Sequence, residues 1–230
     1  ILDSRGNPTI EVTVYTQDSQ GTAAVPSGAS TGIHEVLELR DGGKRYHGNG
    51  VQKAIKIIEK KIKPLLLGVD VTRQREIDEL MIKKDGFQDK SKLGSNSILA
   101  VSLSCARAAA NSQGVALFKY LNNLPQIMVD SKLPRAFFNV INGGKHADNQ
   151  ISFQEFMISP NLKRFKDNLR AASEIYHTLK KLIYKKYGAG STNIGDEGGF
   201  APAKIKKTTE ALDLLKKAIS LSGYNKKVDI

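Results

Sequence analysis

The sequence is poor in cysteine and has no long apolar run. Only one of the 230 residues is a cysteine, so no intrachain disulfide can form. Cys105 lies in the apolar run 98–110, where we expect a buried, unreactive thiol. Sparse cysteine favours a reducing, cytoplasmic setting. No apolar run approaches the roughly 18 residues that span a bilayer, and no basic-then-apolar leader opens the chain, so we expect neither a membrane span nor a retained secretory signal.

Charge of one sign is in excess, and the excess is uneven along the chain. The formal net charge is +12, from 35 basic and 23 acidic side chains. Residues 160–230 hold 15 basic and 7 acidic side chains, a net of +8. Such a surface can attract nucleic acid, anionic membranes or a phosphorylated substrate. Because the lysines fall on the outer stripe of predicted helices and no nucleic-acid-binding motif accompanies them, we predict a solvated face and no nucleic-acid partner.

The first half of the chain combines strand and helix patterns. Residues 9–15 alternate polar and apolar side chains, which is typical of a half-buried strand, and residues 22–25 read as a second strand. Helices are predicted over 51–66, after Thr72, over about 98–110 and over 115–121. Ser95 or Asn96 is a candidate cap for the third of these helices. Strands that lead into helices predict an α+β domain over residues 1–125.

The second half follows a candidate domain boundary near Pro125 and Pro134. Strands are predicted over 135–141 and 151–158, helices over 165–183 and 211–219, and the last residues resemble the start of another strand. The longer helix has a predicted inward stripe that begins with Phe165 and Leu169. The order strand-strand-helix-helix over residues 126–230 indicates an α/β domain that is incomplete.

A glycine-rich loop with two adjacent carboxylates follows the longer predicted helix. It reads Asn-Ile-Gly-Asp-Glu-Gly-Gly-Phe-Ala-Pro over residues 193–202. Glycine lets the backbone approach a ligand closely, and Asp196 and Glu197 could hold a metal or transfer a proton. The alternative is an acidic surface turn.

Two further loops carry polar residues between glycines. Ser30 lies in Pro-Ser-Gly-Ala-Ser-Thr-Gly, where hydroxyl and carbonyl oxygens suit a hard cation such as Mg²⁺. The alternative for this segment is a flexible hairpin loop, and no Walker-type lysine follows it. His146 lies in Asn-Gly-Gly-Lys-His-Ala-Asp, and a lone loop histidine is as a rule a surface residue.

The second strand of this half carries a carboxylate on its apolar face. By alternation Glu155 shares a face with Ile151, Phe153 and Met157, which is costly unless the carboxylate is paired or functional. The alternative is a position at the rim of the strand. Gln154 is predicted on the opposite face, so alternation alone does not direct both side chains to one ligand.

In order and spacing, these segments resemble the enolase family. The segments at 26–32, 142–148, 151–157 and 193–202 carry the resemblance, together with Leu-Asp-Ser-Arg-Gly-Asn-Pro-Thr over 2–9 and Lys-Ser-Lys-Leu-Gly-Ser-Asn-Ser-Ile-Leu over 90–99. The resemblance runs from the first residues to the last. It implies an enolase N-terminal domain over residues 1–125 and the first part of an enolase-type α/β barrel over 126–230. A complete barrel needs about 250 residues, so the barrel is expected to be incomplete.

The resemblance also implies a reaction and roles for residues. The reaction is the Mg²⁺-dependent, reversible dehydration of 2-phosphoglycerate to phosphoenolpyruvate in glycolysis. Glu197 corresponds to the general acid and Glu155 assists it, since a pair of carboxylates can keep one member protonated. His146, Gln154 and Glu155 are implied to bind the substrate, and Ser30 is implied to bind a second Mg²⁺.

The resemblance implies that the lysine base and the main metal ligands lie beyond Ile230. We therefore expect the 230-residue chain by itself to be inactive. The resemblance separately implies that the complete protein is a homodimer. Two alternatives stay open. One is another member of the wider superfamily, and the other is a truncated, non-catalytic derivative with a binding or structural role.

Overall fold

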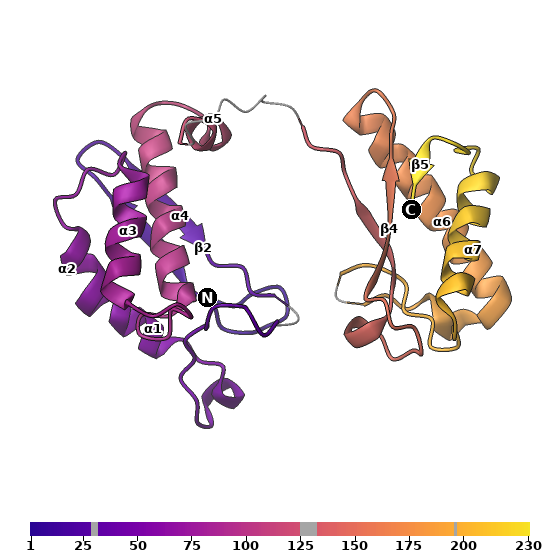
Figure 1. Cartoon of the computed structure of the whole chain (residues 1–230), viewed down its shortest axis with the longest axis horizontal. Coiled ribbons are helices and arrows are strands. Elements are labelled where there is room, and N and C mark those ends of the chain that lie inside the picture. Colours follow the sequence, from indigo (N-terminus) through magenta and orange to yellow (C-terminus); the bar gives the residue numbers. More distant parts are fainter. Residues whose placement is uncertain (29–31, 125–132, 196) are drawn as a thin grey trace. The chain divides into compact units, whose positions relative to one another are not determined.

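The computed structural model describes residues 1–28, 32–124, 133–195 and 197–230 (Figure 1). The chain divides into two compact units, Ile1–Ser131 and Lys132–Ile230. The predicted boundary between residues 125 and 126 lies outside the described residues. No helix in the described ranges is both long and apolar enough to cross a membrane.

A hairpin packed on a long helix organises the first unit. Strands β1 (Glu11–Tyr15) and β2 (Gln20–Ala24) pair antiparallel, with Val14 opposite Gly21. Both strands pack on α4 (Ser95–Ser112). Gly21 allows this close approach, because a Cβ at that position would overlap the α4 backbone at Ser104 and Ala108.

Short helices complete the first unit. They are η1 (Arg45–Gly48), α1 (Gln52–Ile57), η2 (Ile58–Ile62), α2 (Lys63–Leu66), α3 (Gln74–Asp85) and α5 (Leu117–Asn122). The helix predicted over 51–66 therefore forms as a continuous run from α1 to α2, with a π-helical stretch, η2, in its middle. Helices α3 and α5 pack on α4, which makes α4 the centre of this unit.

Helix α4 is buried on most of its faces, as its composition predicts. Its predicted caps are wrong, because the helix starts at Ser95 and neither Ser95 nor Asn96 caps it. Asn96 instead exchanges two hydrogen bonds with the backbone of Leu39, at 3.0 and 3.1 Å. The side chain is used to join α4 to a distant segment, and this tertiary demand overrides local capping.

The second unit contains a three-stranded antiparallel sheet in the order β3-β4-β5. The strands are β3 (Phe138–Asn142), β4 (Glu155–Pro160) and β5 (Val228–Asp229). In the described residues this sheet is open and does not close into a barrel. Strands β3 and β4 begin three to four residues later than predicted, since 135–137 and 151–154 are irregular.

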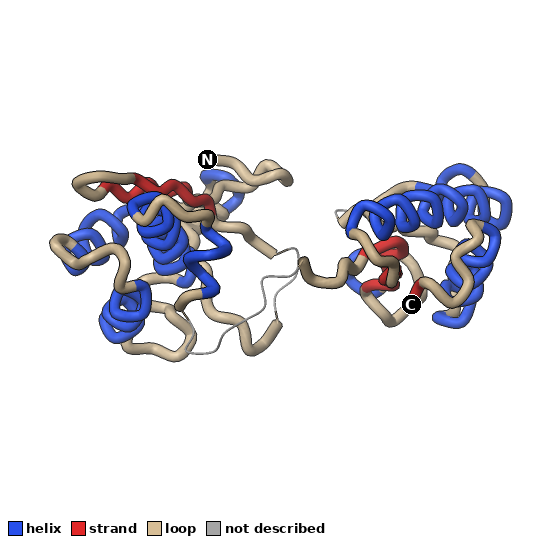
Figure 2. Tube along the Cα trace, turned by 90° about the horizontal axis from the view of Figure 1, so that it is seen from above, coloured by secondary structure: helices blue, strands red, loops and turns tan. Residues whose placement is uncertain are grey.

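Two long helices cover the sheet of the second unit. Helix α6 (Phe165–Tyr187) packs on β4 and on α7 (Thr208–Leu221). Figure 2 shows helices beside the short strands of this unit. Helix α6 continues four residues past its predicted end at residue 183, and Gly188 follows it with a positive φ of 91°. The start of its predicted inward stripe is wrong: Phe165 and Leu169 are exposed, and Asn168 is buried there instead.

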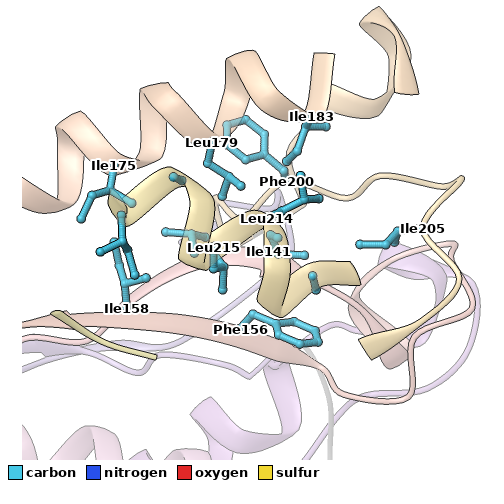
Figure 3. Close-up of a cluster of buried hydrophobic side chains, with 14 of the residues drawn as sticks. Ile141, Phe156, Ile158, Ile175, Leu179, Ile183, Phe200, Ile205, Leu214 and Leu215 are labelled. Carbon is cyan, nitrogen blue, oxygen red and sulfur yellow. The ribbon is translucent and has the colours of Figure 1, made fainter. Parts of the chain in front are cut away.

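One continuous cluster forms the core of this unit. Side chains of α6 and α7 face those of β3, β4 and the segment after α6 (Figure 3). Phe200 is fully buried in this cluster and stacks on Tyr176 of α6, with ring centroids 4.3 Å apart. The core therefore anchors the residue that closes the acidic glycine loop.

Candidate active site

Three titratable side chains from separate segments converge in the second unit. His146 Nδ1 lies 2.7 Å from Glu155 Oε1 and 3.6 Å from Glu197 Oε2. One ligand atom from each of the three residues falls within 4.8 Å of the others. Residues that are 9 to 51 positions apart in the sequence are thereby brought into one cluster.

The connection between β3 and β4 positions His146. The Gly143 amide donates to the Gln154 carbonyl at 2.9 Å, and the Gly144 amide donates to the Ile151 carbonyl at 2.8 Å. A Cβ at Gly143 would overlap the carbonyl of Phe153, and Gly144 has a positive φ of 53°. The two glycines thus allow the loop to fold back, so that His146 lies beside the start of β4.

Gln154 and Glu155 both reach the ring of His146. Gln154 Nε2 lies 3.3 Å from His146 Nε2, and Glu155 lies on the Nδ1 side. The prediction that these two side chains point to opposite faces is wrong, because β4 begins at Glu155 and Gln154 lies in irregular backbone. Side chains alternate between faces only within a strand, and Glu155 is the first residue of β4.

The acidic glycine loop delivers Glu197. The amide of Phe200 donates to the Val140 carbonyl at 3.0 Å, and the Asn142 amide donates to the Phe200 carbonyl at 2.9 Å. These bonds attach the end of the loop to β3. Asn139 Nδ2 then donates to Glu197 Oε2 at 3.1 Å. Ser30 and Asp196 lie outside the described residues.

The sequence did not predict three residues that contact the acidic glycine loop, namely Asn139, Asn142 and Tyr176. The hydroxyl of Tyr176 donates to the Gly198 carbonyl at 2.7 Å, in the same loop as Glu197. The two asparagines could have been found from the sequence, because they lie in a strand that otherwise reads Phe-Val-Ile and buried polar side chains need partners. Tyr176 gives no comparable signal, since a tyrosine on the inner stripe of a helix is ordinary core.

Buried polar atoms without a hydrogen-bond partner gather around this cluster. Within the described ranges they include Asn139 Oδ1, both amide atoms of Asn142 and His146 Nδ1. The 2.7 Å contact of His146 with Glu155 is therefore a close ionisable pair that is not an aligned hydrogen bond. Unpaired buried polar groups cost stability, and such sites are typically functional.

Mg²⁺ does not fit the cluster as it stands. Magnesium prefers six oxygen ligands at about 2.1 Å, which places neighbouring ligands about 3.0 Å apart. The cluster offers two carboxylate groups and a ring nitrogen, and the nitrogen is a softer donor than the oxygens that Mg²⁺ prefers. The described residues of the cluster are better arranged for proton transfer than for holding this metal.

Exposure separates the roles of the three side chains. The side chain of Glu197 is 41% exposed, whereas those of Glu155 and His146 are 26% and 12% exposed. Glu197 is therefore accessible to a ligand, with the closer His146–Glu155 pair behind it. An accessible carboxylic acid beside a second carboxylate and an imidazole is an arrangement for general acid–base chemistry.

Two family models match the chain. The model of the enolase N-terminal domain matches residues 1–121, and that of the enolase C-terminal TIM barrel domain matches residues 130–230. Among curated proteins, the chain is similar to "Enolase" of Thermococcus gammatolerans and of Pyrococcus furiosus. Each is 56% identical over 225 residues, covering 97% of this chain and 51% of the relative.

A eukaryotic relative shows similar coverage. "Enolase B" of Dictyostelium discoideum is 53% identical over 232 residues, covering 100% of this chain and 52% of that protein. The chain thus spans about half the length of the curated relatives that it matches. Identity at this level along the whole chain, in proteins from distant organisms, confirms the resemblance carried by the six sequence motifs: the chain belongs to the enolase family.

Proposed function

We propose that the complete protein catalyses the reversible dehydration of 2-phosphoglycerate to phosphoenolpyruvate. The observation that carries this proposal is the convergence of Glu197, Glu155 and His146 on one side of the second unit. Membership of the enolase family supports the choice of reaction. Because the chain spans about half of its relatives, the proposal concerns the whole protein.

Glu197 is the general acid of the proposed reaction. A base removes the proton from the carbon next to the carboxylate, the carbon–oxygen bond to the hydroxyl breaks, and Glu197 donates a proton to the departing hydroxyl, which leaves as water. Its exposure beside two less exposed ionisable groups suits this role. Glu155 supports it as the second carboxylate of the pair.

His146 and Gln154 bind the substrate in this proposal. Both belong to the β3–β4 connection, and their side chains already contact one another at 3.3 Å. A loop that holds polar side chains against the reacting acid can orient the substrate and exclude water from the acid. The partner is therefore a small phosphorylated acid, and we propose no nucleic-acid partner.

Mg²⁺ remains the proposed cofactor, with ligands outside the described residues. Ser30 is the proposed ligand of a second ion, and the main ligands and the lysine base are proposed to lie beyond Ile230. The chemistry expected from the bound ion is stabilisation of the negative charge that develops on the substrate carboxylate. A homodimeric, cytoplasmic protein completes the proposal.

The decisive variant is Glu197→Gln in the complete protein. The amide keeps the shape of the side chain but cannot donate a proton as an acid does, so turnover should fall by about 10²-fold or more while substrate binding persists. Phosphoenolpyruvate formation measures the first quantity and calorimetry the second. Turnover that stays within threefold of the unmodified protein would show that Glu197 is not the acid.

A further inference from the structure

The loop that carries Glu197 is held from two sides by residues that are not themselves titratable near neutral pH. On one side β3 contributes Asn139 and Asn142, and on the other α6 contributes Tyr176. None of these residues belongs to the His146–Glu155–Glu197 cluster. Their contacts explain how an exposed carboxylate keeps one orientation.

The backbone of the loop is closed at its base. The Gly195 amide donates to the Gly199 carbonyl at 2.9 Å, and the Gly198 amide donates to the Gly195 carbonyl at 3.0 Å. Ile194 and Phe200 form an antiparallel bridge across the same base, and Phe200 also bridges Ile141 of β3. The loop therefore has little freedom where it joins the sheet.

Tyr176 fixes the far end of the loop. Its hydroxyl donates to the carbonyl of Gly198, the residue after Glu197, at 2.7 Å. Its ring stacks on buried Phe200 with an interplanar angle of 18°, so the core holds the ring itself in place. Burial raises the pKa of the Tyr176 hydroxyl, which keeps it protonated and able to donate.

A bulge in β3 directs two asparagines to the same side of the strand. Residues three apart in a regular strand face opposite ways, but the β3–β4 pairing shifts between Asn139 and Ile141. As a result, Asn139 and Asn142 both meet Gly199: a Cβ there would overlap Asn142 Oδ1 and lie 3.0 Å from Asn139 Oδ1. The glycine is needed for the asparagines to contact the loop.

Asn139 also distinguishes the two oxygens of Glu197. Its amide donates to Oε2 at 3.1 Å, so Oε2 is the accepting, carbonyl-like oxygen when the carboxyl group is protonated. The transferable proton is then carried by Oε1. A freely rotating side chain that is 41% exposed would present its proton in the productive direction only part of the time.

We propose that Asn139 and Tyr176 are positioning residues for the acid Glu197, Asn139 by orienting its carboxyl group and Tyr176 by fixing the loop. This inference rests on the proposed role of Glu197. It predicts that loss of either contact slows the proton transfer and leaves the affinity for substrate nearly unchanged.

The test uses Tyr176→Phe and Asn139→Ala in the complete protein, with 2-phosphoglycerate as substrate. Tyr176→Phe deletes one hydroxyl and keeps the ring on Phe200. Each variant should lower kcat about tenfold with KM within threefold. Tyr184→Phe, on the exposed face of the same helix, and Asn225→Ala, on an exposed loop, are the matched controls and should leave kcat unchanged.

A double-mutant cycle separates positioning from a general loss of stability. In the Glu197→Gln background the proton transfer is already lost, so Tyr176→Phe and Asn139→Ala should lower kcat no further. Additive losses, or losses matched by a lower melting temperature, would overturn the inference. A Glu197→Gln variant of normal activity would instead contradict the proposed function, so the two failures are distinguishable.

Discussion

The ring of His146 is contacted by two residues that are neighbours in sequence, Gln154 and Glu155. Neither contact follows from a strand pattern, because the backbone changes from irregular to extended between these two residues. At the scale of single residues, the site thus depends on where a strand begins. A one-residue shift in the pairing register of β4 with β3 would turn Glu155 to the other face of the sheet.

Cys105 provides a prediction at the residue scale. The thiol is 4% exposed, and burial raises its pKa to about 11, with the nearby charge of Asp78 as the smaller cause. The thiolate is the reactive form, so at pH 8 the native protein should react with an aromatic disulfide reagent at least about 100-fold more slowly than the denatured protein.

The measurement is the rate of thiol release with and without denaturant at one pH. Treatment with a reducing agent before the reaction, followed by its removal, ensures that the cysteine is free at the start. Equal rates in the two conditions would mean that Cys105 is accessible in the folded chain and that α4 does not bury it in solution.

At the scale of elements, the start of α7 is stabilised by one carboxylate. Glu210 Oε2 accepts from the Lys206 and Lys207 amides at 3.0 and 3.3 Å, and Oε1 accepts from Lys186 Nζ at 3.0 Å. These contacts lower the pKa of Glu210 to about 2 from an ordinary value of 4.5, and the hydrogen bond from the Lys206 amide is the largest cause. The charged form therefore ties α7 to the end of α6.

A carboxyl group with a lowered pKa stabilises the folded state above its unfolded pKa, and this contribution disappears as the pH falls through the folded value. Glu210→Gln should lower the melting temperature by about 3 °C at pH 7. The difference from the unmodified chain should shrink between about pH 4.5 and pH 2. Melting curves across this range test it, and a difference that is constant with pH would contradict the assigned cause.

At the scale of the whole molecule, the chain is shorter than the enolases that it resembles. The relatives are about twice as long as the part that matches. Under the proposed function, the base and the main metal ligands belong to a part of the protein outside this chain. We predict that the purified 230-residue chain does not convert 2-phosphoglycerate, with or without Mg²⁺. Mg²⁺-dependent turnover by a homogeneous sample of this length would contradict the prediction.

The intact mass of the protein as its source makes it should be measured alongside that assay. A mass well above 25.1 kDa would place this chain within a longer enzyme, whose activity the Glu197 variant then tests. A mass of 25.1 kDa would favour the alternative of a non-catalytic member of the family with a binding or structural role.

The sequence by itself determined the family and most of the elements. Six motifs in order identified the enolase family, and periodic apolar residues located α6, α7 and the β1–β2 hairpin, because these patterns are local. Only the tertiary structure decided that Gln154 and Glu155 meet at one histidine. It also decided that a bulge and a helix hold the Glu197 loop, since such contacts join segments up to 58 residues apart, beyond the reach of any local pattern.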